Sequence, residues 1–162
     1  MKVVFRFFRR FAFRQPRTPR ERALASLARG DFAAAETALT ALIESAGDFD
    51  ERRFLLNKRG VARVASGART EAETDFAAAL ERGPYAPALA NLGNLALERG
   101  ELAAAIEHYE AAVAADEANA TAHLNLAIAY KRCGRTAESV REFRRAQRLE
   151  GRRFRSPMSA SS

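Results

Sequence analysis

The sequence predicts an all-α fold in which pairs of antiparallel helices stack as similar units. The stretch beginning at Asn91 recurs at Asn125, and Gly100 recurs at Gly134, so equivalent residues are separated by 34 positions. A period of this length is typical of solenoids, in which each unit packs on its neighbours. In addition, no segment alternates apolar and polar residues over a length that predicts a strand. These observations favour a helical repeat array over an enzyme core with a single site.

The repeat covers residues 16–153 and divides into four units. Their predicted limits are 16–52, 53–85, 86–119 and 120–153. In the third unit, Gly93 and Ala105 are small residues that would let two helices approach closely, while Tyr109 would fill the remaining space. The first unit matches the pattern at the fewest positions and is followed by a short insertion. We therefore expect four helix pairs, of which the first is the most divergent.

A glycine follows the first apolar stripe of the last three units. Gly67, Gly100 and Gly134 occupy this position. A glycine at the end of a helix is typical of a left-handed terminal turn, which a side chain would oppose. The substitution Gly100→Val is therefore predicted to destabilise the stack.

This pattern resembles that of the tetratricopeptide repeat (TPR) family. In the unit that starts at Ala86, the matching residues are Leu89, Leu92, Gly93, Gly100, Ala105, Tyr109 and Ala112. In the unit that starts at Ala120, they are His123, Leu126, Ala127, Tyr130, Gly134, Phe143 and Ala146. The resemblance implies a right-handed α-solenoid of about four TPR units. It also implies a noncatalytic adaptor or scaffold that binds a protein or an extended peptide.

The resemblance further implies where a peptide would bind, because the first helices of successive TPR units line a concave groove. The expected groove residues are Phe54, Asn57, Lys58, Val61, Asn91, Asn94, Asn125, Lys131 and Arg132. Asparagine offers both a donor and an acceptor, which suits it to holding a peptide backbone. Local hydrogen bonds within the array are the alternative role for these asparagines. Two basic residues, Lys131 and Arg132, are candidate anchors for an acidic group, or part of a solvated helix face.

Residues 1–15 lie outside the repeats and form a basic, aromatic segment. On a helix, one side would be apolar and the other would carry arginine and lysine, which is typical of helices that lie in a membrane interface or dock on a partner. The expected anchor residues are Val4, Phe5, Arg6, Phe7, Phe8, Arg9, Arg10 and Phe11. Arginine interrupts the segment too often for it to span a bilayer. Packing on the first repeat, or a disordered tail, is the alternative.

Charge is distributed unevenly along the chain. Residues 1–20 carry seven basic and no acidic side chains, residues 21–130 are acidic overall, and residues 131–155 are basic again. Acidic partners would therefore meet the two ends. The alternative function is a nucleic-acid-associated TPR protein that binds phosphate backbones through these basic ends. The expected location is the cytoplasm, with peripheral membrane association through residues 1–15.

The sequence contains no motif that indicates catalysis or cofactor binding. Cys133 is the single cysteine, and His108 and His123 fall where the repeat expects structural residues. We therefore expect neither an enzyme nor a cofactor. Residues 154–162 are predicted to form a disordered tail, which would leave the last repeat uncapped and open to oligomerisation.

Overall fold

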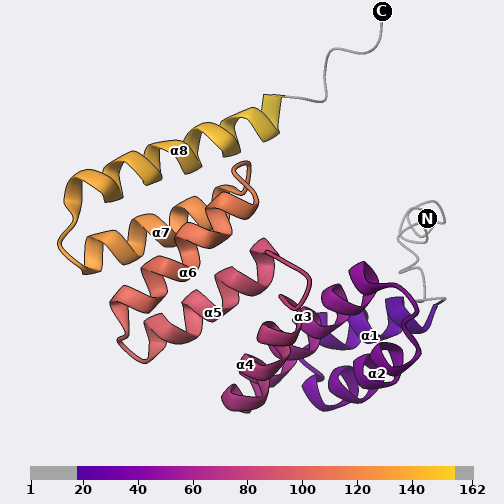
Figure 1. The fold of residues 1–162 in the computed structure, drawn as a ribbon. Coiled ribbons are helices and arrows are strands. Elements are labelled where there is room, and N and C mark those ends of the chain that lie inside the picture. Colours follow the sequence, from indigo (N-terminus) through magenta and orange to yellow (C-terminus); the bar gives the residue numbers. More distant parts are fainter. Residues whose placement is uncertain (1–17, 156–162) are drawn as a thin grey trace, which may run out of the picture.

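The computed structural model describes residues 18–155, and this part of the chain contains eight α-helices and no strand (Figure 1). In chain order, the helices are α1 (Pro19–Ala28), α2 (Phe32–Ser45), α3 (Phe49–Ser66), α4 (Arg69–Ala78), α5 (Ala86–Glu98), α6 (Leu102–Ala115), α7 (Ala120–Arg132) and α8 (Thr136–Arg155). Each helix packs on the one that follows it. The predicted all-α solenoid of helix pairs is thereby confirmed.

Two helix ends differ from the unit limits expected from the sequence. Helix α3 begins at Phe49, upstream of the expected start of the second unit at 53. The reason is the N-cap Asp48, whose carboxylate accepts a hydrogen bond from the Glu51 amide at 3.0 Å and starts the helix one turn earlier. Helix α8 runs to Arg155, so residues 154 and 155 belong to this helix and not to a tail.

The first helices of the pairs lie next to one another, with α3 touching α5 and α5 touching α7. Helices α1 and α8 lie at opposite ends of the array in Figure 1. Helix α8 therefore has no following unit within residues 18–155, and one of its faces ends the stack.

The turn glycines adopt the predicted left-handed conformation. Gly67, Gly100 and Gly134 have φ values of 92°, 78° and 78°. This is the region that side chains oppose, so these glycines set the reversal between the two helices of a unit.

Two further glycines let the paired helices approach closely. A Cβ atom added at Gly60 would lie 2.5 Å from the Phe76 ring, and one added at Gly93 would lie 2.6 Å from the Tyr109 ring. Both rings are fully buried, with an exposed fraction of 0%. Each aromatic ring thus packs directly on the backbone of the first helix of its unit.

A buried ion-pair network joins helices α2, α3 and α4. Asp75 is 2% exposed and accepts two hydrogen bonds from Arg59, at 2.7 and 3.0 Å, and one from Arg63 at 2.9 Å. Arg63 also donates to Glu36 at 2.7 Å. Because the buried carboxylate has charged partners on two sides, the network fixes the first two units against each other.

Candidate protein-binding surface

Helices α3, α5 and α7 carry the residues predicted for the groove. Most of these residues are at least partly exposed, and we call them the first-helix surface: Phe54, Lys58, Val61, Asn91, Asn94, Asn125, Lys131 and Arg132. The predicted residue Asn57 is only 4% exposed, so it lies between helices and not on the open surface.

A cavity of about 240 Å3 lies on this surface between α3 and α5. It is lined by Val61, Val64, Ala65, Phe76, Asn91, Asn94, Leu95 and Glu98. Its lining is mainly apolar, and amide and carboxylate groups of α5 complete it. A cavity of this chemistry can take an apolar side chain while polar groups bind the backbone that carries it.

The asparagines of this surface are bonded to one another across units. Asn91 donates to the Asn57 Oδ1 atom at 2.9 Å, and Asn125 donates to the Asn94 Oδ1 atom at 3.4 Å. The Tyr109 hydroxyl also donates to Asn94, at 2.7 Å. Part of the hydrogen-bonding capacity of these amides is therefore used to fix the packing of successive units. This is the alternative role that the sequence left open for the asparagines.

Asn94 retains both of its amide N–H donors for an external partner. Its side-chain oxygen is occupied by two donors, but its amide nitrogen makes no hydrogen bond within residues 18–155. The residue is exposed and lines the cavity. An amide donor at this place can bind a peptide carbonyl group.

The two ends of the first-helix surface are basic. At one end, Arg20 of α1 and Lys58 of α3 lie over the Phe54 ring, with 4.5 and 5.3 Å to its centroid. At the other end, Lys131 and Arg132 are exposed and form no ion pair within the described part of the chain. These two cations are therefore free to meet an acidic group.

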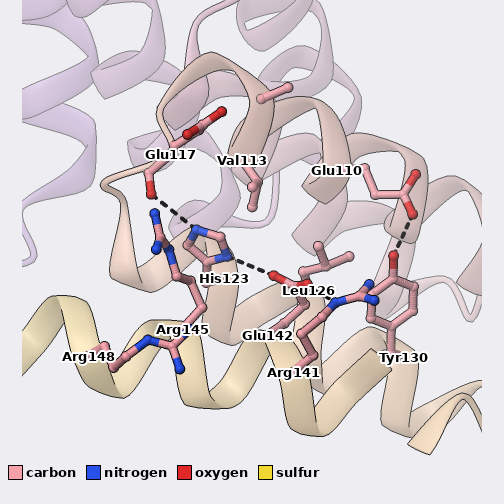
Figure 2. Close-up of a pocket in the computed structure, with 11 residues that line it drawn as sticks. Glu110, Val113, Glu117, His123, Leu126, Tyr130, Arg141, Glu142, Arg145 and Arg148 are labelled. Carbon is pink, nitrogen blue, oxygen red and sulfur yellow. Dashed lines mark hydrogen bonds and ion pairs between the residues drawn. The ribbon is translucent and has the colours of Figure 1, made fainter. Parts of the chain in front are cut away.

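A second cavity, of about 580 Å3, lies among α6, α7 and α8 (Figure 2). His123 and Glu142 line it, together with the exposed or half-buried arginines 141, 145 and 148. Figure 2 shows His123 between the Glu142 carboxylate and the Glu117 carbonyl oxygen, at 2.8 and 3.2 Å. The buried histidine thus ties α7 to α8 and to the loop that follows α6, which is a structural role.

Electrostatics around this cavity follow from the same contacts. Burial opposes ionisation of Glu142, but hydrogen bonds from His123 and Arg141 outweigh it and lower the pKa of this carboxyl group. Burial and a hydrogen bond to Glu110, of 2.6 Å, raise the pKa of Tyr130 to about 12. These shifts keep Glu142 ionised and Tyr130 neutral, and the polar groups mostly satisfy one another.

The predicted anchor in residues 1–15 lies outside the described residues. Among residues 18–155, no helix is long and apolar enough to cross a membrane. The same residues contain no group of three or more histidine, cysteine, aspartate or glutamate side chains that could hold a metal ion.

Comparison with known sequences decides the family. One TPR model matches residues 20–87, a second matches 93–134, and a third matches 120–152. The chain belongs to the tetratricopeptide repeat family. No curated protein matches the sequence. TPR proteins bind protein partners, so this chain is a protein-binding repeat scaffold.

Solved structures agree with this TPR fold. A tetratricopeptide repeat protein from Parabacteroides merdae is 20% identical with a TM-score of 0.65, and the match covers 78% of this chain and 50% of that protein. The chain thus spans half the length of that relative. Two structures of MamA have TM-scores of 0.56 and 0.54 at 20% and 19% identity, covering 82% and 86% of this chain and 96% and 94% of theirs. At these identities, the likeness shows the fold.

Sequence reasoning missed some residues of the surface. Leu95 and Glu98 line the α3–α5 cavity but were not named as groove residues. The signal was present for Glu98, because it precedes Arg132 by one repeat of 34 residues. Arg20 was also missed, because its contact with Phe54 joins two units and depends on how they stack.

Proposed function

We propose that this TPR protein is a noncatalytic adaptor whose first-helix surface binds an extended peptide of a partner protein. The observation that carries the proposal is the cavity between α3 and α5, where an apolar lining is combined with the free amide donor of Asn94. An apolar side chain of the peptide would fill the cavity, and its backbone would accept from Asn94.

Charge differs between the cavity and the α7 end of the first-helix surface. Glu98 lines the cavity, whereas Lys131 and Arg132 lie one unit further along, without acidic partners in residues 18–155. Glu98 is paired with Arg69 at 3.1 Å, so the charge preference comes from α7, where an acidic residue or a terminal carboxylate on the peptide would be favoured. We expect bound peptides to carry an apolar residue followed or preceded by an acidic one.

A selection of random peptides displayed on phage against the full chain tests this proposal. Selected peptides are expected to lose affinity by about tenfold or more with Val61→Asp, because the substitution puts a carboxylate into an apolar pocket. Ala77→Asp is the matched control, since Ala77 is exposed on α4 and lies outside the cavity. Circular dichroism checks that both variants are folded.

Equal affinity for Val61→Asp and the unsubstituted chain would contradict the proposed site. If no peptide is selected but the full chain binds single-stranded RNA with an affinity that falls steeply with salt, the nucleic-acid function holds instead.

We also propose that residues 1–15 tether the scaffold to a membrane surface or a larger complex. Support comes from the sequence, where a helix drawn over this segment has one apolar side and one basic side. The apolar side carries Val4, Phe7, Phe8 and Phe11, and the basic side carries Lys2, Arg6, Arg9 and Arg10. Sedimentation with anionic and neutral liposomes tests it, comparing the full chain with a chain in which Phe7, Phe8 and Phe11 are serine. Binding by the full chain that the substitutions abolish is expected, while no sedimentation of the full chain would exclude the membrane.

A further inference from the structure

The last unit ends in an apolar face that no other part of residues 18–155 covers. A cavity of about 430 Å3 between α7 and α8 opens on this face. We call it the terminal face, lined by Leu124, Ala127, Ile128, Lys131, Thr136, Ser139, Val140 and Phe143. The large residues Ile128, Val140 and Phe143 are 41%, 43% and 45% exposed. Among residues 18–151, they are the large apolar residues that remain exposed.

The preceding unit shows what occupies this place when the stack continues. The residues 34 positions before Val140 and Phe143 are Ile106 and Tyr109, which are 5% and 0% exposed. They share a cluster with Leu126 and other residues of α7, the first helix of the next unit. The terminal face is therefore a surface on which one more helix can pack, in the way that α7 packs on α5 and α6.

The charged residues at the terminal face differ from those at the equivalent positions of the preceding unit. Lys131 stands where the preceding unit has Leu97, and Arg144 stands where it has Glu110. Glu110 accepts a hydrogen bond of 2.6 Å from the Tyr130 hydroxyl of α7, so its position reaches the incoming helix. An incoming helix at the terminal face would consequently meet two cations in place of a leucine and a carboxylate.

Neither cation is neutralised by the protein itself. Within residues 18–155, Lys131 and Arg144 form no ion pair, and both are exposed. Carboxylates on the incoming helix would pair with them at the rim of an apolar contact, which favours an acidic partner over a basic one.

A second copy of this chain would fit the terminal face poorly. Stacked head to tail, its α1 would present Arg22, Ala25 and Ser26 at the positions where α7 presents Leu126, Ala129 and Tyr130. That helix would add a cation and no large apolar side chain to the contact. Residues 1–17 carry six basic residues and no acidic one, so this segment would also be repelled.

We propose that the terminal face binds an acidic amphipathic helix of a partner protein, which stacks on α7 and α8 as the first helix of a further unit. Its apolar residues would recur at the spacing of Leu126 and Tyr130, and its flanking positions would carry glutamate or aspartate. This interaction does not involve the cavity between α3 and α5, although it shares Lys131 with the acidic end of the proposed peptide site.

Fluorescence anisotropy with synthetic helices tests the proposal on the full chain. The probe is a labelled peptide of about 16 residues, long enough to form helix, with leucine, alanine and tyrosine at the α7 spacing and glutamate at the flanking positions. Its counterpart has lysine for every glutamate. The glutamate peptide is expected to bind, and the lysine peptide is expected to bind about tenfold or more weakly.

Substitutions in the protein test whether the peptide binds to the terminal face. Phe143→Ser should lower the affinity for the glutamate peptide by about tenfold or more, because binding no longer buries an aromatic ring. Arg144→Glu should reverse the preference between the two peptides. The matched control is Arg148→Glu, the same charge change on α8 at the other cavity, which should preserve the preference.

Other outcomes overturn the proposal. Equal binding of both peptides, or no binding of either, would remove the acidic helix as occupant. Sedimentation velocity adds an independent reading: a dimer that Phe143→Ser dissociates would show that a second copy covers this face. Because Phe143 is 45% exposed, its replacement should lower the melting temperature only modestly, and thermal unfolding of the variant distinguishes a loss of binding from a loss of fold.

Discussion

Replacement of Gly93 by alanine tests how closely the helices of a TPR unit pack. The added Cβ atom would lie 2.6, 2.8 and 3.0 Å from three atoms of the Tyr109 ring, whereas ordinary contacts begin near 3.4 Å. The ring cannot easily retreat, because it is fully buried and its hydroxyl donates to Asn94 at 2.7 Å. The methyl group must therefore displace the ring or push the two helices apart.

The magnitude follows from two opposing effects. Overpacking a well-packed core costs about 1–3 kcal/mol, and the fixed ring places this site at the upper end. Replacing a helical glycine with alanine contributes about 1 kcal/mol in the opposite direction. The net loss is about 2 kcal/mol, equivalent to a decrease of about 4–8 °C in melting temperature for a domain of this size.

Thermal unfolding followed by circular dichroism measures this change. Gly151→Ala is the matched control, because Gly151 lies in α8, is exposed, and has no atom within 4 Å of an added Cβ. It should be stabilising by about 0.5–1 kcal/mol. A Gly93→Ala protein as stable as the unsubstituted chain would refute the close approach of α5 and α6.

Three further perturbations have defined outcomes in the same unfolding experiments. Asp75→Ala leaves two partly buried arginines without their carboxylate and should cost about 3 kcal/mol, whereas Arg69→Ala, which removes an exposed ion pair, should cost less than about 0.5 kcal/mol. Gly100→Val forces a branched side chain to φ 78° and should cost about 2 kcal/mol. Burial raises the pKa of Tyr109 from 10.0 to about 12, so the contribution of Tyr109 to stability should be constant below pH 10 and be lost between pH 10 and pH 12; Tyr109→Phe should reduce this fall. Equal costs for Asp75→Ala and Arg69→Ala, an unchanged melting curve for Gly100→Val, or an alkaline loss that Tyr109→Phe leaves intact would contradict the respective assignments.

The repeat made most of the fold predictable. The small and large residues recur at a fixed period, and each packs on a residue of its own or the next unit, so pattern and structure agree at Gly93 and Tyr109. The start of α3 was not predictable from the repeat, because the N-cap Asp48 lies outside the repeated positions. Local capping chemistry decided this boundary.

The candidate site was predictable only in outline. The sequence indicates which helix positions face a shared surface, but it does not show how much of each side chain is used between units. Asn57 illustrates this limit, since it is buried by α5 and accepts from Asn91. The cavity at Val61 likewise forms only when α3 and α5 pack side by side. The uncapped last repeat, by contrast, was expected from the sequence, and Val140 and Phe143 are exposed within the described residues.

The most direct test of the scaffold's function is to map a selected peptide on the full chain by hydrogen–deuterium exchange. The first-helix surface predicts slower exchange in α3, α5 and α7 when the peptide is bound, with the largest change around the cavity at Val61 and Asn94. Protection confined to α2, α4, α6 and α8 would contradict the account, because it would place the partner on the second helices of the units.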